Sequence, residues 1–169
     1  HRTAKLPLPG PEGSGKVVTG RWDPNTVYAI QDVSPWKIFK STNACTTPFK
    51  DITGTDIAGI LPSVRKYDIV GPPYDPNTMY VGTDLGVFKT TNNGATWKRY
   101  QWGMPIVPVT NLVYVPGTSG DPDTMRIGTF GKGFYQRVIN GDDPPVTYYR
   151  FGDPILGIDF LGEIGIAAG

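Results

Sequence analysis

The chain has 169 residues, enough for one domain with a hydrophobic core. Sixteen basic side chains nearly balance fifteen acidic ones. Because no basic block occurs, a nucleic-acid partner has no electrostatic support. A single cysteine rules out an internal disulfide, and a single histidine leaves a zinc site poorly supplied. We therefore expect no metal and no cofactor. No apolar run of about 18 residues occurs, so no membrane span is expected.

One short segment recurs three times along the chain. "DPNTVYAI" at Asp23 returns as "DPNTMYVG" at Asp75 and as "DPDTMRIG" at Asp121. A second apolar segment follows each copy: "KIFKST", "GVFKTT" and "GFYQRV". Proline fixes φ for a turn, and Asp and Asn side chains bond the backbone just downstream, so each copy predicts a turn that begins a strand. Strand-like runs without helical periodicity indicate an all-β protein.

The repeats divide the chain into three units. We predict these units at residues 16–53, 64–101 and 109–151, after a lead-in at 1–15 and before an apolar, Gly-rich tail at 152–169. Three or four short strands form one small sheet, which cannot bury both faces alone and must stack on its neighbours. Radial stacking of four-stranded antiparallel sheets gives a β-propeller; a β-solenoid or a sandwich is the alternative.

Three blades cannot close a ring, because closed propellers use about four to eight. The predicted ring is therefore incomplete on this chain, and we expect other copies or other chains to complete it. The tail at 152–169 would be an aggregation hazard if exposed. We expect it to pack on a partner or to pair with a sheet edge.

The segment "KTTNNGATWKRY" (Lys89–Tyr100) places small polar residues, a glycine and a tryptophan at fixed spacing. It resembles the Asp-box (BNR) repeat, Ser-x-Asp-x-Gly-x-Thr-Trp, with Thr for Ser and Asn for Asp. The matching residues are Thr90, Asn92, Gly94, Thr96 and Trp97. A less complete copy lies in the first unit, where Ser41 and Asn43 match, Cys45 replaces the glycine and Phe49 replaces the tryptophan. The third unit has no copy.

The resemblance implies a structural role for these residues. In Asp-box propellers, among them sialidase-like, xyloglucanase-like and sortilin-like proteins, the box fastens a hairpin on the outer rim, away from substrate. The residue chemistry agrees, because Asn92 can cap the turn and Gly94 can supply a positive φ. Such propellers are common in exported proteins, so an extracellular or cell-surface location is expected.

A ligand is expected at the loops that join second to third strands and at the connections between blades. Aromatic rings there could stack on a sugar while carboxylates bond its hydroxyls. The alternative is that Trp36 and Trp102 only cover blade edges. The candidate ligand-binding residues are Asp32, Trp36, Asp56, Asp84, Trp102, Phe130 and Lys132.

No catalytic constellation is visible. Glycoside hydrolysis needs two carboxyl groups that flank one bond, and Asp32 and Asp84 are candidates only by position. Sialidase-type chemistry needs clustered arginines, which the chain lacks. We predict a non-catalytic structural or recognition module that binds a glycan or a protein. The alternative is a fragment of a xyloglucanase-like or sialidase-like glycoside hydrolase whose acids are shared with other blades.

Overall fold

The computed structural model describes residues 15–20, 23–54, 59–100 and 103–139, together with the backbone of three strands at 146–149, 159–161 and 164–166. Every regular element in these residues is a β-strand. The strands form three four-stranded sheets and one two-stranded sheet. The all-β prediction of four-stranded antiparallel sheets is therefore confirmed.

Each four-stranded sheet is antiparallel, and its strands follow one another in chain order. The first sheet contains β1 (Gly15–Thr19), β2 (Val27–Gln31), β3 (Ile38–Ser41) and β4 (Lys50–Asp51). The second contains β5 (Lys66–Val70), β6 (Met79–Thr83), β7 (Gly86–Thr90) and β8 (Lys98–Arg99). The third contains β9 (Val109–Val115), β10 (Asp123–Thr129), β11 (Phe134–Ile139) and β12 (Val146–Tyr149). The short strands β13 (Asp159–Leu161) and β14 (Ile164–Ile166) pair with each other.

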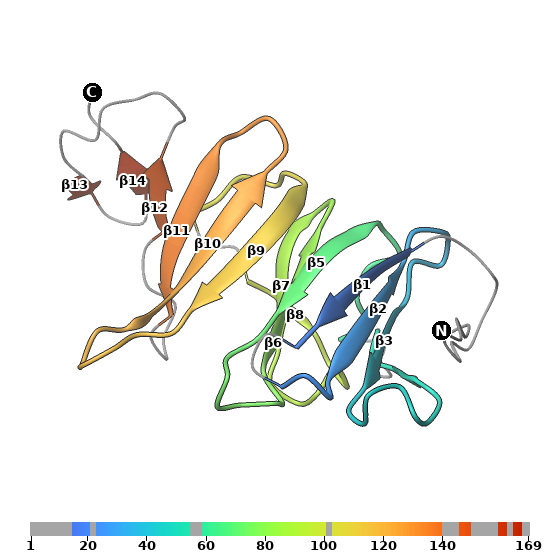
Figure 1. Ribbon diagram of the computed structural model, residues 1–169. Helices are drawn as coiled ribbons and strands as arrows, with labels where there is room; N and C mark the ends of the chain where they lie inside the picture. The colour runs from blue at the N-terminus through green and yellow to red at the C-terminus, as the bar shows by residue number, and fades with distance from the viewer. Residues whose placement is uncertain are drawn as a thin grey trace, which may run out of the picture.

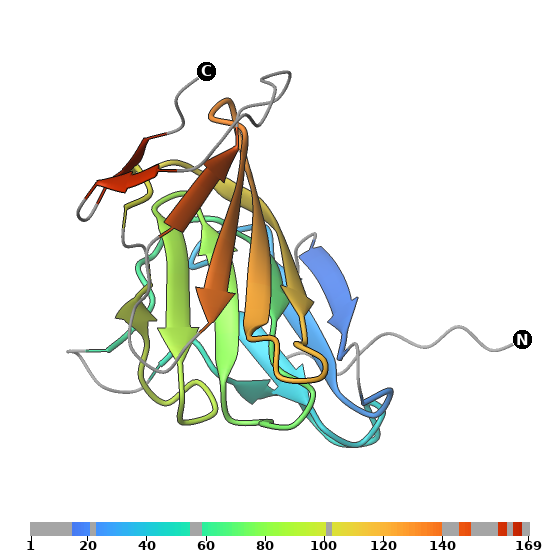
Figure 2. The ribbon, with the colours of Figure 1, turned by 90° about the vertical axis from the view of Figure 1, so that its left-hand side faces the viewer.

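The sheets stand side by side like adjacent blades (Figure 1). Figure 2, turned by 90°, shows them overlapping face to face, with the third sheet nearest the viewer. Strand β5 contacts both β1 and β9, so the first strand of each sheet lies next to the first strand of its neighbour. This is the side-by-side stacking that sheets with two apolar faces require.

The repeated turn forms through its first aspartate in two of the three copies. Asp23 Oδ1 accepts the Asn25 N–H at 2.9 Å, and Asp75 Oδ1 accepts the Asn77 N–H at the same distance. The third copy differs, because Asp123 takes over the acceptor role instead of Asp121. Its carboxylate accepts the N–H of Gly117 and the hydroxyls of Tyr74 and Tyr114. Asp123 stands where the other copies have asparagine, and its carboxylate binds Tyr74 of the second blade.

Two clusters of buried apolar side chains lie between the sheets. Between the first and second sheets, Tyr28 and Ile38 pack with Ile69, Val81 and Trp97. Between the second and third sheets the cluster contains Tyr80, Val87, Tyr100, Val109, Leu112, Tyr114, Met125, Ile127 and Tyr135. The apolar residues of the repeats therefore form interfaces between blades.

Candidate ligand-binding rim

The loops expected to hold a ligand lie at one end of the strands. They join β2 to β3, β6 to β7 and β10 to β11, and the connections between blades reach the same end. In Figure 1 the β10–β11 loop stands at the upper end of the third sheet. We call this end the loop rim. The opposite end, which carries the β1–β2 and β3–β4 loops and their equivalents in the other sheets, is called the turn rim.

Two predicted carboxylates meet at the loop rim around one arginine. Asp32, just after β2, forms an ion pair with Arg65 at 3.0 Å between Oδ1 and Nε. Asp84, in the tight β6–β7 turn, accepts the Arg65 backbone N–H at 3.1 Å and the Tyr67 hydroxyl at 2.7 Å. Because Arg65 and Tyr67 frame the start of β5, one segment joins the loops of two blades. We call Asp32, Arg65, Tyr67 and Asp84 the rim cluster.

The rim cluster is open to solvent. The side chains of Arg65 and Asp32 are 50% and 48% exposed. Burial, followed by the hydrogen bond to Asp84, raises the pKa of Tyr67, so the phenol stays protonated and donates. Carboxylates in an ion pair or accepting two donors serve as hydrogen-bond acceptors. The cluster offers fixed acceptors and a fixed cation to a ligand rich in hydroxyl groups.

A buried lysine lies beside this cluster. Lys66 is 3% exposed and donates from Nζ to the Pro62 carbonyl at 2.7 Å. Burial lowers its pKa to about 8, against the smaller attraction of Asp51 and Asp84. Asp51 in turn pairs with Lys37 at 2.7 Å. Lys66 therefore contributes to the structure under the rim.

Of the other predicted ligand residues, three lie in the β2–β3 and β10–β11 loops and two lie outside the described residues. Trp36 is half-buried in the loop that begins with Asp32. Phe130 is 75% exposed in the β10–β11 loop, where Lys132 is also exposed. Asp56 and Trp102 lie outside the residues that the structure describes. The sequence reasoning missed Arg65 and Tyr67, although the run "RKYD" at the start of β5 carries both.

The Asp-box-like segments build matching loops at the turn rim. Thr90 Oγ1 donates to Asn92 Oδ1 at 2.9 Å, and Asn92 Oδ1 also accepts the Thr96 N–H at 2.9 Å. Asn92 Nδ2 donates to Thr96 Oγ1 at 2.8 Å. Trp97 is buried and donates from Nε1 to the Ile52 carbonyl of the preceding blade at 2.8 Å. The loop therefore closes on itself and attaches its blade to the previous one.

The first blade repeats this network. Ser41 Oγ donates to Asn43 Oδ1 at 2.9 Å, and Asn43 Nδ2 donates to Thr47 Oγ1 at 2.7 Å. Cys45 has φ +64° where Gly94 has φ +82°. A cysteine thus adopts the left-handed conformation that glycine takes in the second blade.

A hollow of about 330 Å³ opens on the turn rim between the blades. Pro72, Pro73 and Val18 give it apolar walls, and Lys40 and Asp75 lie at its edge. The Lys40 ammonium already donates to the Pro76 carbonyl and to Asn93 Oδ1, at 3.0 and 2.8 Å. The charged groups of the hollow therefore serve the fold, and the rim cluster is the stronger ligand candidate.

The described residues contain neither a metal-binding cluster nor a membrane-spanning helix. Among residues 15–20, 23–54, 59–100 and 103–139, no three acidic, histidine or cysteine side chains are placed to hold a metal ion. Within the described residues, no helix has the length and apolar character to span a bilayer.

Comparison with known proteins identifies the fold of this chain. No family model matches the sequence, and no curated protein matches it. A GH74 xyloglucanase from Xanthomonas campestris has a similar structure, with a TM-score of 0.53, 19% identity and 82% of this chain covered. An ancestral GH74 enzyme gives a TM-score of 0.50, 17% identity and 75% coverage. This chain has the β-propeller fold. It spans 19% of the length of each of these two structures.

Proposed function

We propose that this chain is a recognition segment of a larger, extracellular β-propeller and that its loop rim binds a polysaccharide. The observation that carries this proposal is the rim cluster. Asp32 and Asp84 lie around Arg65 as fixed acceptors on an exposed surface, with half-buried Trp36 in the same loop as Asp32. Sugar hydroxyls suit such acceptors and cations, while a ring face suits the indole.

Both carboxylates of the rim cluster are held as acceptors. A general acid in glycoside hydrolysis must carry a proton, and its partner carboxylate must face the reacting carbon. Asp32 instead faces a guanidinium, and Asp84 accepts a hydroxyl and a backbone amide. This arrangement supports binding over cleavage by this chain alone.

The test is calorimetric titration of the chain with xyloglucan oligosaccharides. Arg65→Met should raise the dissociation constant about tenfold, because a charged hydrogen bond to a ligand is worth about 1.5–3 kcal/mol. Lys98→Ala is the matched control, since Lys98 is exposed on the outer strand β8. Equal affinities of wild type, Arg65→Met and Asp32→Asn would contradict the proposal.

The second candidate is a fragment of a glycoside hydrolase, which the likeness to the two GH74 structures favours. Its test is the release of reducing ends from xyloglucan. Cleavage by the chain that disappears in both Asp32→Asn and Asp84→Asn would establish this alternative. Binding without cleavage would support the recognition segment.

A further inference from the structure

The first strands of the three blades carry a polar residue at one repeated position. These residues are Lys16 in β1, Asp68 in β5 and Asn111 in β9. In the paired second strands, the residues opposite them are Ile30, Gly82 and Gly128. The three residues therefore occupy equivalent positions in their sheets.

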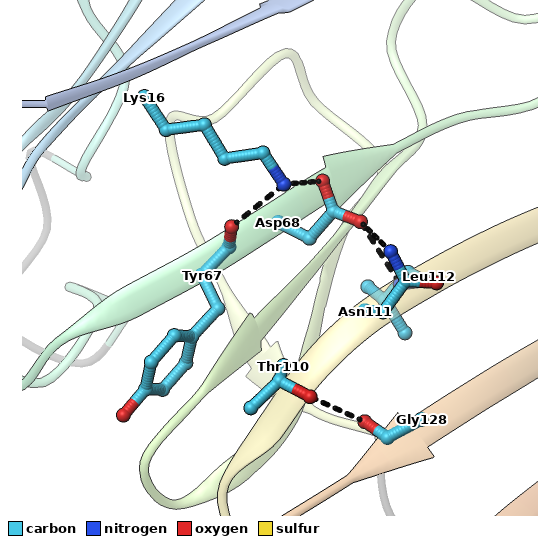
Figure 3. Close-up of polar contacts among 7 residues, drawn as sticks. All are labelled: Lys16, Tyr67, Asp68, Thr110, Asn111, Leu112 and Gly128. Carbon is cyan, nitrogen blue, oxygen red and sulfur yellow. Dashed lines mark hydrogen bonds and ion pairs between the residues drawn. The ribbon is translucent and has the colours of Figure 1, made fainter.

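At this position, each side chain of the first two blades reaches the first strand of the next blade (Figure 3). Lys16 Nζ donates to Asp68 Oδ1 at 2.9 Å and to the Tyr67 carbonyl at 3.1 Å. Asp68 Oδ2 accepts the Leu112 backbone N–H at 3.0 Å and Asn111 Nδ2 at 3.3 Å. The blades are thus connected in series through one polar row.

Asn111 ends this row, and its side-chain oxygen Oδ1 remains available as an acceptor among the described residues. Its Nδ2 is used toward Asp68, and none of the described residues donates to its Oδ1. The Asn111 side chain is exposed. Asp68 Oδ2 of the second blade accepts the Leu112 N–H of the next first strand, and Asn111 Oδ1 is placed to accept a backbone N–H in the same way.

The third blade also exposes an apolar position that the other blades bury. On the third strands, Ile38, Val87 and Phe134 pair with the residues of the second strands that lie opposite the repeated position. Ile38 and Val87 are 0% exposed, whereas Phe134 is 55% exposed. Burying a side chain as large as Phe134 would be favourable, because it removes a large apolar surface from water.

Gly82 shows how closely the next blade approaches. A Cβ on Gly82 would lie 2.6 Å from the Val109 carbonyl oxygen of the third blade. A Cβ on the equivalent Gly128 would have only ordinary contacts, the nearest at 3.4 Å. The third blade therefore shares this glycine with the second blade, whereas the first blade has Ile30 there, and the nearest neighbours of Gly128 belong to its own sheet. We call Asn111, Gly128 and Phe134 the open face.

The first blade is exposed in the complementary way. Val17, Ile69 and Leu112 are equivalent in the first strands. Ile69 and Leu112 are 1% and 3% exposed because a blade precedes each of them, whereas Val17 is 54% exposed. One chain therefore presents both halves of the junction that it uses internally.

We propose that a second copy of this chain places its β1 on the open face. Its Val17 N–H donates to Asn111 Oδ1, its Val17 side chain covers Phe134, and its backbone passes over Gly128. Two such junctions related by a two-fold axis join two sets of three blades into six, within the range of closed propellers. The inference names the partner within the proposed function and rests on its propeller part, not on sugar binding.

The experiment is sedimentation equilibrium of the whole chain over a range of concentrations. The expected mass is twice the 18.4 kDa of one chain. Gly128→Ala should raise the dimer dissociation constant at least about tenfold, because its Cβ obstructs the approaching strand. The nearest contact of that Cβ, 3.4 Å away, leaves the fold of the single chain unaffected. Thr118→Val, an exposed loop change, is the control and should leave the constant unchanged.

A mixing experiment tests the pairing of the two faces. Val17→Lys should also prevent dimerisation, because it places a charge in the junction. A mixture of Gly128→Ala and Val17→Lys chains keeps one junction intact, so it should associate more tightly than either variant alone. A monomeric wild-type chain, or a dimer that both variants leave unchanged, would overturn the proposal. A monomer that still binds xyloglucan oligosaccharides would overturn this inference and leave the proposed function standing.

Discussion

At the scale of single residues, two asparagines organise equivalent loops through their side-chain amides. Asn43 and Asn92 each accept a hydroxyl from two residues before and donate to a threonine four residues after. Asn, Ser and Thr side chains form such local bonds in turns, where they take the place of the hydrogen bonds of a regular strand. The loops at 41–47 and 90–96 are held in this way.

Asn92→Ala should therefore lower the free energy of unfolding by about 1 kcal/mol, since it removes bonds at an exposed loop. Urea denaturation measures the change. Thr91→Ala, at the exposed neighbouring position, should change it by less than about 0.5 kcal/mol. Equal effects of the two substitutions would count against a capping role for Asn92.

Lys66 makes stability depend on pH at the residue scale. Its pKa is about 8 in the folded chain and 10.5 when unperturbed. Between these values the unfolded chain binds more protons than the folded chain, so the free energy of unfolding rises with pH through that window. The cost of burying the charged ammonium is present in full below pH 8 and is relieved above it.

The measurement compares wild type with Lys66→Met by urea denaturation at several pH values from 7 to about 10. The stability of the wild type should rise relative to the variant as pH increases across this range. Two curves that run parallel would show that Lys66 titrates as an ordinary exposed lysine does.

At the scale of elements, loops at the turn rim also attach one blade to the next. The Gly94 backbone lies against Ile52, which follows β4 of the first blade, and a Cβ on Gly94 would lie 2.6 Å from Ile52 Cβ. The neighbouring Trp97 donates to the Ile52 carbonyl. The β7–β8 loop is therefore part of the interface between the first and second blades.

Gly94→Ala and Gly120→Ala form a matched pair for this interface. Both glycines have a positive φ, +82° and +95°, so both substitutions carry backbone strain of about 1 kcal/mol. Only the Gly94 side meets neighbouring atoms, since a Cβ on Gly120 meets none within 4 Å. Gly94→Ala should cost about 1–3 kcal/mol more in unfolding free energy. Similar costs in thermal and urea unfolding would contradict the tight contact.

At the scale of the whole molecule, Asp68 connects all three blades. Its side chain is 8% exposed and binds Lys16 of the first blade and Asn111 and the Leu112 amide of the third. A nearly buried carboxylate with several donors therefore couples the three sheets through hydrogen bonds, in addition to the apolar contacts between them.

Asp68→Ala should lower the free energy of unfolding by about 2–3 kcal/mol, because it leaves buried donors unpaired. Asp51→Ala is the control, since Lys37 and Asp51 pair within one blade and are 41% and 36% exposed, and its cost should stay near 1 kcal/mol. The Asp68 variant should also lose cooperativity, with separate transitions for the blades. A single sharp transition with the same midpoint as wild type would exclude the connecting role.

The sheets could be predicted from the sequence because neighbouring residues specify their turns and strands. Proline and aspartate at positions 23–24 and 75–76 specify turns, and the apolar alternation that follows specifies strands, whatever the rest of the chain does. The positions of Asp32 and Asp84 at one rim also followed, because strand order fixes the end at which each loop emerges.

What only the tertiary structure decided was which residues meet across blades. Arg65 lies between Asp32 and Asp84, and Lys16, Asp68 and Asn111 form one row, through contacts between residues tens of positions apart. Nothing in the local sequence marks such contacts, because they depend on the stacking distance of whole sheets. The chain thus specifies each blade by its own short-range chemistry, while the rim cluster and the open face exist only once the blades are packed.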